Sequence, residues 1–342
     1  KDHFPTTPVV LLTPFSREVF QRVFAGEDFT AIDYTFNWLG EPDILLAIVK
    51  LLEDKMNVDR DVQSVGVQAI LFVEDSIHFY SALLPYLYKH VFLQSRSFMT
   101  EALNEHEQML RMRGRPKIVL ARSYEEAMHL YNRYQNNVLG VITDARYPRE
   151  GIVDPMAGIK LMAEIRKHDP FVPLILQSAE VDNRKYISQY EASFVDKNSK
   201  KMDVDLRDIV SDNFGFGDFV FRNPHTLEEV ARVRNLKELQ NIIFHIPTES
   251  FLYHVQHNHI SRWLYSRAMF PIAEFLKPIT WNSLQDVDAH RHIIMEAIVK
   301  YRKMKNQGVV AIFRRDRFDR YSNFARIGEG SLGGKGRGLA FI

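Results

Sequence analysis

The sequence contains no cysteine, which excludes disulfide bridges, thiolate metal sites and cysteine nucleophiles. It also lacks any apolar run near the ~20 residues that cross a bilayer, and its first residues do not read as a signal peptide. The formal net charge is only +1, so no polyanion-binding surface is indicated. These absences predict a cytoplasmic protein whose partners include neither nucleic acid nor a membrane, and its 342 residues suffice for two or three domains.

One short pattern occurs twice, as "KDHFPTTPVVLLT" from Lys1 and as "RKHDPFVPLILQS" from Arg166. Each copy joins a proline to an uninterrupted apolar run that ends in a hydroxyl residue, Thr13 or Ser178. Such runs are typical of strands buried on both faces of a parallel α/β sheet. Each copy continues with a helical stretch and a second short strand, "AIDYTF" or "ASFVDK". The repeat unit is therefore β-α-β-α.

The residues before the second copy add three more strands. "AILFVEDS" (69–76) is an apolar strand that ends in two acids, and "KIVLARSYEEAMHLYNRY" (117–134) is a strand with a helix. "LGVITDARYP" (139–148) is a strand that ends in an aspartate, and a helix follows it. Five strands that alternate with helices predict an α/β, flavodoxin-like (βα)5 fold with a doubly wound parallel sheet.

Polar side chains stand at or just after the ends of four of these strands: Glu74 with Asp75, Asp144, Ser178 and Lys197. In doubly wound sheets the ligand crevice lies outside the carboxyl ends of the strands. We therefore expect these five side chains to converge on one edge of the sheet.

Residues 68 to 213 resemble the receiver domain of two-component response regulators. "FVEDS" is similar to the acidic pair after the first strand, and "VITDARYP" to the phosphoacceptor loop. "MAGIKLM" is similar to the helix that follows, "LILQSA" to the strand with the switch hydroxyl, and "SFVDK" to the strand with an aromatic residue and a lysine. The resemblance implies signal reception by phosphorylation.

In that family an aspartate becomes an aspartyl phosphate with the help of Mg²⁺. The resemblance implies that Asp144 is the phosphoacceptor and that Glu74, Asp75, Asp144 and the backbone carbonyl of Arg146 hold the metal. It also implies that Lys197 pairs with the phosphoryl group, that Ser178 hydrogen-bonds it, and that Phe194 changes rotamer in the switch.

The sequence departs from the family in two places near this site. Asn198 follows Lys197, where the family usually has proline. The interval between Asp75 and Lys117 is about twice what one helix and a turn need, which predicts a helical insertion near 90–115. That insertion forms a dimer or interdomain contact, or it packs on its own domain.

The first 58 residues resemble the second half of another receiver, namely its last two strands, each followed by a helix. Asn37 and Trp38 stand where the family has Lys-Pro, which indicates a pseudo-receiver. A half-unit leaves a sheet edge uncovered. We therefore expect its first three strands to precede residue 1 in a longer chain or to come from a partner chain.

The region after the receiver is expected to be all-α. Thr226 and Glu229 match a capping box that would start the helix "LEEVARVRNLKELQNIIFHI", and two more helices follow Pro247 and Asp286. His254, His257 and His259 invite a metal-site interpretation, but the spacing favours packing, capping or interface roles.

The last residues, "ARIGEGSLGGKGRGLAFI", are rich in glycine. "GGKGRGLAF" resembles the start of the nucleotide-binding domain of phosphoenolpyruvate synthase and pyruvate phosphate dikinase. The resemblance implies that Gly333, Gly334, Lys335 and Gly336 approach the phosphates of ATP in that downstream domain. A glycine-rich tail without this role is the alternative.

The predicted organisation is a partial receiver at 1–58, a linker at 59–68, a receiver at 69–213, a helical coupling domain at 214–306 and the start of a nucleotide-binding domain at 307–342. In the first hypothesis a sensor histidine kinase phosphorylates Asp144 and thereby controls a downstream phosphotransferase domain in cis. In the second, the receiver is an unphosphorylated docking or dimerisation module. In the third, the full-length protein is an enzyme whose receivers are vestigial.

Overall fold

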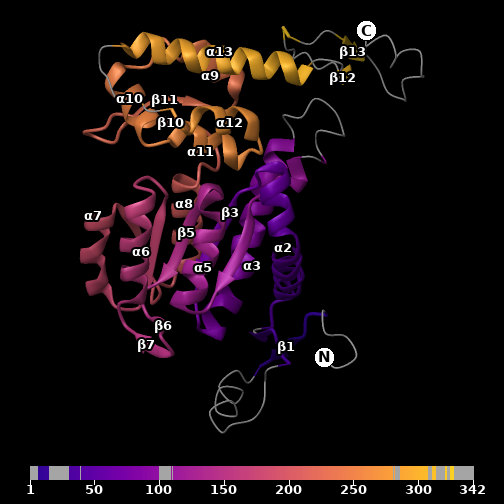
Figure 1. The fold of residues 1–342 in the computed structure, drawn as a ribbon, viewed down its shortest axis with the longest axis vertical. Coiled ribbons are helices and arrows are strands. Elements are labelled where there is room, and N and C mark those ends of the chain that lie inside the picture. Colours follow the sequence, from indigo (N-terminus) through magenta and orange to yellow (C-terminus); the bar gives the residue numbers. More distant parts are fainter. Residues whose placement is uncertain are drawn as a thin grey trace. The chain divides into compact units, whose positions relative to one another are not determined.

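The computed structural model describes residues 7–14, 31–38, 40–99, 109, 111–279, 281, 286–306, 310–312, 320–321 and 324–326. The chain divides into two compact units (Figure 1). Unit 1 comprises Lys1–Phe92 and Pro116–Asn213, and unit 2 comprises Leu93–Arg115 and Phe214–Ile342. Among the described residues, no helix has the length and apolar character needed to traverse a bilayer.

The centre of unit 1 is a five-stranded parallel sheet in the order β4-β3-β5-β8-β9. Its strands are β3 (Ala69–Val73), β4 (Lys117–Ala121), β5 (Val138–Asp144), β8 (Leu174–Ser178) and β9 (Ala192–Asp196). Every residue of β3, β4, β5 and β8 is buried, as continuous apolar runs require. This order is that of flavodoxin-like doubly wound sheets and confirms the predicted α/β class.

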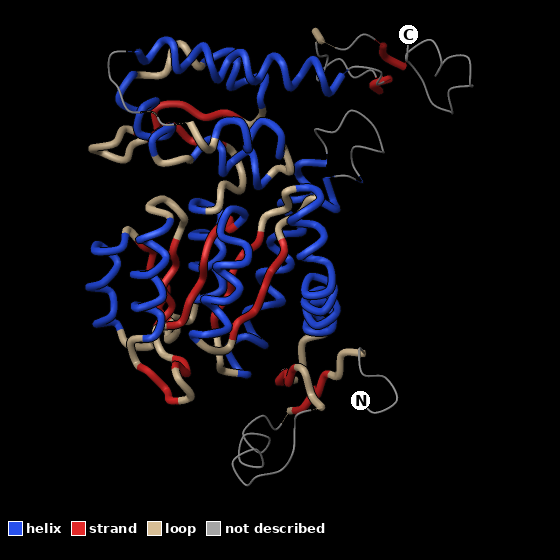
Figure 2. The backbone as a smooth tube through the Cα atoms, viewed as in Figure 1, coloured by secondary structure: helices blue, strands red, loops and turns tan. Residues whose placement is uncertain are grey.

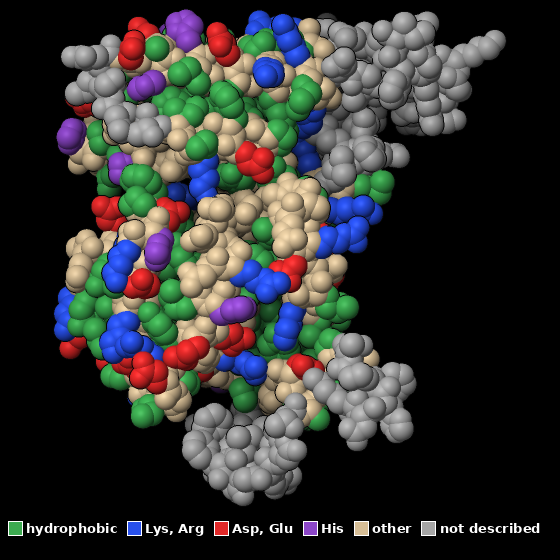
Figure 3. Space-filling view, viewed as in Figure 1, with side chains coloured by type: hydrophobic (Ala, Val, Ile, Leu, Met, Phe, Trp, Pro, Cys, Tyr) green, Lys and Arg blue, Asp and Glu red, His purple; other side chains and the backbone are tan. Residues whose placement is uncertain are grey.

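Helices cover both faces of this sheet (Figure 2). They are α3 (Ile77–Met99), α5 (Tyr124–Tyr134), α6 (Ala157–His168), the η2–α7 segment (Val181–Tyr190) and α8 (Met202–Asn213). The inward sides of α5 and α6 share one apolar core with the sheet. On the other face α3 meets α8, where the Ser211 hydroxyl lies 3.0 Å from His90 Nε2. Basic and acidic side chains are interspersed over the face drawn in Figure 3.

A β-hairpin follows β5 that the sequence analysis did not foresee. It consists of β6 (Tyr147–Arg149) and β7 (Ile152–Asp154). Glu150 and Gly151 at its turn both have positive φ, 55° and 76°, the conformation that tight two-residue hairpins need. The Glu150 N–H donates to a carboxylate oxygen of Glu125 at 2.9 Å, which ties the hairpin to α5.

The N-terminal part of unit 1 contains the parallel pair β1 (Val10–Thr13) and β2 (Tyr34–Asn37), followed by α2 (Asp43–Val65). We call β1, β2 and α2 the N-terminal module. The expected linker at 59–68 is helical as far as Val65, because no glycine or proline interrupts α2 before Gly66. Gly66 ends the helix in the left-handed conformation at φ 81°.

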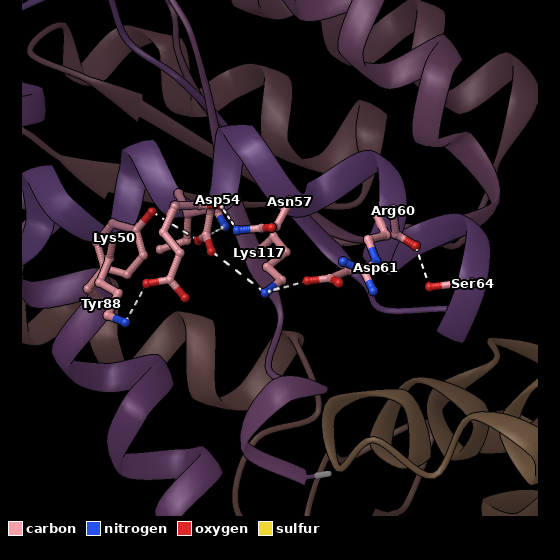
Figure 4. A network of polar contacts seen from close by, with 10 residues as sticks. Lys50, Asp54, Asn57, Arg60, Asp61, Ser64, Tyr88 and Lys117 are labelled. Atoms are coloured by element: carbon pink, nitrogen blue, oxygen red, sulfur yellow. Dashed lines mark hydrogen bonds and ion pairs between the residues drawn. The ribbon is translucent and has the colours of Figure 1, made fainter. Parts of the chain in front are cut away.

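A buried polar network joins α2 to β4, the edge strand of the sheet (Figure 4). One carboxylate oxygen of Asp54 accepts the Ile118 N–H at 2.9 Å and the Tyr88 hydroxyl at 3.0 Å. The Lys117 ammonium lies 2.8 Å from Asp61 and 3.9 Å from Asp54. An edge strand presents backbone groups that need partners, so Asp54 provides a partner that a neighbouring strand would otherwise supply.

Unit 2 is mainly helical. Its helices are α9 (Leu236–Ile242), α10 (Thr248–Gln256), α11 (His259–Ser266), α12 (Phe270–Leu276) and α13 (Val287–Asn306), and its short strands are β10 (Phe219–Arg222), β11 (Glu229–Val233), β12 (Val310–Ile312) and β13 (Phe324–Arg326). The Arg267 guanidinium lies 4.3 Å from the ring centre of Phe98, so the insertion before β4 packs within this unit.

The helix predicted from Thr226 and Glu229 is wrong. Residues 229–233 form β11, which pairs antiparallel with β10 and buries Val233. Helix α9 begins later, where the side chain of Asn235 accepts the Glu238 N–H at 2.9 Å. The helix expected after Pro247 is also divided in two, because Asn258 adopts a left-handed φ of 56° between α10 and α11.

Candidate functional site

The structure brings four of the predicted site residues together at the carboxyl edge of the unit 1 sheet. Glu74 and Asp75 follow β3, Asp144 ends β5 and Lys197 follows β9. Carboxylate oxygens of Glu74, Asp75 and Asp144 all lie within 4.8 Å of one another. We call these three side chains the acidic cluster.

Lys197 bridges two members of the acidic cluster. Its ammonium lies 2.6 Å from Glu74 Oε2 and 2.7 Å from Asp144 Oδ2. The Lys197 side chain is only 3% exposed, so these contacts form in a region of low dielectric, where charge-assisted bonds are strong. The same ammonium lies 4.2 Å from the ring centre of Phe79.

The charges of the acidic cluster are not balanced. Three carboxylates face a single ammonium, which leaves an excess of negative charge when all of them are ionised. Burial raises the pKa of the Glu74 carboxyl above its usual range, although Lys197 opposes this shift. Burial also raises the pKa of Asp75, and the neighbouring Asp144 carboxylate raises it further. A bound cation would relieve both effects.

Backbone groups fix the orientation of the acidic cluster. Asp144 Oδ1 accepts the N–H of Ala145 at 2.7 Å, and Glu74 Oε1 accepts the N–H of Ser76 at 3.1 Å. Gly158, in the first turn of α6, lies directly against the Asp144 backbone. A Cβ at position 158 would stand 1.9 Å from the Asp144 carbonyl oxygen, so only glycine fits there.

Ser178 lies at the same edge, at the end of β8. Register pairs Gln177 with Asp144 and Ser178 with Asp196 in the neighbouring strands. The Ser178 hydroxyl oxygen accepts the Glu180 N–H at 3.0 Å and the Asn183 side-chain amide at 2.9 Å. It is therefore engaged with the start of η2 in this structure.

The remaining predicted residues occupy the rim or lie outside the described residues. Phe194 is half-buried in β9, with the Arg184 guanidinium 5.1 Å from its ring centre. Arg146 is exposed in the loop after Asp144. Asn198, which replaces the family's proline, donates its side-chain amide to the Ala179 carbonyl at 2.7 Å and so links the loops after β8 and β9. Residues 333–336 lie outside the described residues.

Sequence reasoning missed Phe79, Gly158 and Asn183 as parts of this site. Phe79 follows the acidic pair by about one helical turn. A helix predicted to start at Ile77 would therefore have indicated that Phe79 lies near the site. Gly158 lay within the quoted helix motif, but the spacing to Asp144 gave no sign of their contact. Asn183 becomes recognisable only when η2 is placed beside Ser178.

Comparisons with known proteins give only distant similarity. No family model matches the chain, and no curated protein matches it. A solved response regulator receiver domain protein from Clostridium thermocellum shares 17% identity at a TM-score of 0.30, covering 43% of this chain and 94% of that one. The non-phosphorylated HemR receiver domain from Leptospira biflexa shares 20% identity at a TM-score of 0.26, covering 42% and 94%. The flavodoxin-like fold of unit 1 follows from its own strand order.

Proposed function

We propose that unit 1 receives a phosphoryl group on Asp144 and acts as the signal-receiving part of a two-component system. The observation that carries this proposal is the buried Lys197 ammonium, which contacts Asp144 and Glu74 at 2.7 and 2.6 Å. A strand-end carboxylate, two neighbouring acids and an ammonium at one edge of the sheet are the groups that formation of an aspartyl phosphate requires. The resemblance to response regulator receivers rests on the same residues.

In the proposed reaction a carboxylate oxygen of Asp144 attacks the phosphorus atom of a donor. For a sensor histidine kinase the donor is a phosphohistidine, so the P–N bond breaks and the imidazole leaves with its electron pair while the acyl phosphate forms. Lys197, already 2.7 Å from Asp144 Oδ2, would neutralise charge on the phosphoryl oxygens. The Ala145 N–H, which donates to Asp144 Oδ1, orients the attacking carboxylate.

The acidic cluster suits Mg²⁺. It offers hard oxygen donors within 4.8 Å of one another, and its excess negative charge calls for a divalent cation. Glu74, Asp75 and Asp144 would hold the ion, with the Arg146 carbonyl as a further ligand implied by the family. When bound, the cation supplies positive charge to the phosphoryl oxygens.

The output of the proposed reaction is a local switch. Ser178 would give up its contacts with Glu180 and Asn183 to donate its hydroxyl to the phosphoryl group. Phe194 would then change rotamer as the loop after β8 moves. Such a change biases a two-state element rather than deforming the sheet.

Acetyl phosphate with Mg²⁺, followed by intact mass measurement, tests the proposal. We expect the wild-type protein to gain one phosphoryl group, Asp144→Ala to gain none, and Asp154→Asn, an acid of the neighbouring hairpin, to behave as the wild type. An absence of any adduct in the wild type would overturn phosphorylation and favour the docking module. A sensor histidine kinase would replace acetyl phosphate as the donor in the cell.

The link to a downstream phosphoenolpyruvate synthase-like domain that binds ATP is a further part of the proposal. It rests on the sequence around Lys335 alone. Formation of phosphoenolpyruvate from pyruvate and ATP by the full-length protein, compared with and without Asp144→Asn, tests it. Activity that is indifferent to this substitution would support vestigial receivers instead.

A further inference from the structure

The first turn of α3 contacts two different parts of unit 1 through consecutive residues. The Phe79 ring lies against the Lys197 ammonium, 4.2 Å from ring centre to Nζ. The Tyr80 hydroxyl donates to the Thr35 carbonyl of β2. The Ser81 hydroxyl oxygen accepts the Asn37 N–H of β2 at 2.9 Å. One helical turn therefore touches both the site lysine and the N-terminal module.

The contact between Phe79 and Lys197 limits where the ammonium can go. Two carboxylates hold it at 2.6 and 2.7 Å, and the face of the aromatic ring lies 4.2 Å away. A ring face attracts a cation through its quadrupole, most strongly where water is excluded. Phe79 itself is half-buried, and its ring also lies against the ring of His78, with centres 5.5 Å apart.

The side chains on the other side of the turn are buried. Tyr80 is 1% exposed, Ser81 1% and Phe36 0%. The rings of Phe36 and Tyr80 pack edge to face with centres 5.3 Å apart. Buried hydrogen bonds to the Thr35 carbonyl and the Asn37 N–H are costly to break, so the end of β2 fixes the position of the turn that carries Phe79.

We propose that Phe79 is a positioning residue for Lys197 and that the N-terminal module sets its place through Tyr80 and Ser81. The inference rests on the proposed function to the extent that Lys197 acts on a phosphoryl group. The N-terminal module contains none of the site residues. The inference nevertheless gives it an indirect role in the chemistry of Asp144.

The test compares four variants. Phe79→Leu removes the ring, and Phe79→Tyr keeps it as the conservative rescue. Tyr80→Phe removes only the hydroxyl that reaches β2. Tyr88→Phe is the matched control, since it removes a hydroxyl on the same helix that contacts Asp54 in the α2–β4 network.

The first measurement is the rate at which acetic anhydride labels Lys197, followed by peptide mass spectrometry. It requires no phosphorylation and therefore tests the positioning independently of the proposed function. Loss of a partly buried cation–π contact corresponds to about a three- to tenfold change, so we expect labelling to rise by that factor in Phe79→Leu. A smaller rise is expected in Tyr80→Phe, with Phe79→Tyr and Tyr88→Phe at the wild-type rate. Equal labelling in Phe79→Leu and the wild type would overturn the inference.

The second measurement is the dependence of the phosphorylation rate on acetyl phosphate concentration. We expect Phe79→Leu to lower the maximal rate about three- to tenfold with little change in the half-saturating concentration, and Phe79→Tyr to restore the rate. A loss that Phe79→Tyr fails to restore would contradict positioning by the ring. If the wild type takes up no phosphoryl group while labelling behaves as expected, the proposed function fails and the placement of Lys197 by Phe79 stands.

Discussion

Lys117 and Lys197 are both buried in unit 1, yet their surroundings differ. Lys117 begins β4 and faces Asp54 and Asp61, and Asp54 also accepts bonds from a backbone N–H and a tyrosine hydroxyl. Asp61 is 27% exposed, so water shares its charge. Lys197 follows β9 and faces a cluster of three carboxylates, one of them fully buried.

The two lysines show how a structural ion pair can be distinguished from a binding site. Asp54 makes its hydrogen bonds to groups of the same chain, so the α2–β4 network holds two elements together. Its acceptor oxygens are therefore already used and are poorly suited to bind a ligand. The acidic cluster keeps an excess of negative charge and raised pKa values at Glu74 and Asp75. Perturbed carboxyls at the carboxyl edge of a doubly wound sheet are typical of a functional site.

The largest effect is expected from Asp54→Ala. It leaves the buried Lys117 without one partner and the Ile118 N–H without its acceptor. Breaking a buried ion pair costs about 3–5 kcal/mol, so urea unfolding should show a loss of that size. A change below about 1 kcal/mol would mean that the network resembles an exposed salt bridge and does not hold α2 to the sheet.

Lys197→Met should act on chemistry instead. Removal of one preorganised charge-stabilising group typically costs about 100-fold or more in rate, so phosphorylation by acetyl phosphate should fall by that factor. Lys117→Met, measured under conditions where it remains folded, should leave the rate within about twofold because Lys117 belongs to the α2–β4 network. Equal losses in both variants would erase the distinction between the two lysines.

Mg²⁺ should stabilise the acidic cluster and not the α2–β4 network. A ligand at 100 times its Kd adds about 2.7 kcal/mol to the free energy of unfolding. We therefore expect Mg²⁺ to raise the Tm of the wild type, and Asp75→Asn to remove most of the rise. Asp61→Asn is the control and should keep it. If Mg²⁺ still raises the Tm of Asp75→Asn by the same amount, the ion binds at another site.

The smallest expected effect is a pH dependence of stability. It has opposite signs for His254 in unit 2 and for Glu74 in the acidic cluster. His254 Nε2 accepts the Arg222 N–H at 2.8 Å, and its Nδ1 lies 2.9 Å from His259 Nδ1, an arrangement that needs neutral rings. Burial lowers the pKa of His254 to about 4. The unfolded chain then binds the proton more readily, so stability is lost as pH falls from 6.5 towards 4.

Between pH 7 and pH 5.5 the titration of His254 should lower the free energy of unfolding by about 1 kcal/mol. The raised pKa of Glu74 has the opposite sign, because the folded state holds its proton more tightly and is favoured as pH falls. The protection factors of α10–α11, which are corrected for the intrinsic exchange rate at each pH, should therefore fall on acidification, while those of β3 should not. The substitution His254→Gln should weaken the pH dependence measured for α10–α11. If that pH dependence is unchanged in the variant, other groups cause it.

The sequence predicted the sheet of unit 1 and the gathering of its strand-end residues. The apolar runs 69–73 and 174–176 are too short for buried helices and too continuous for exposed strands, so their secondary structure is decided locally. Parallel strands must place their carboxyl ends at one edge, which brings Asp144 and Lys197 together. The chemical roles of these residues remain predictions.

Residues 226–235 show where local pattern was insufficient. Thr226 and Glu229 satisfy the spacing of a capping box, but Val233 is buried in a strand against Phe219. The burial of apolar side chains across a hairpin outweighs the roughly 1 kcal/mol that a capping interaction typically contributes. The real cap, Asn235 with Glu238, has the same kind of sequence signature.

Local sequence patterns were enough to predict the elements of the unit 1 sheet and the residues at its carboxyl edge, because alternation of apolar runs and helices leaves few arrangements. The folded chain was needed to show that Asp54 partners the edge strand, that Phe79 faces Lys197 and that Tyr80 reaches β2. These contacts join residues far apart in the chain, and their energy depends on burial and direction, which no local pattern contains.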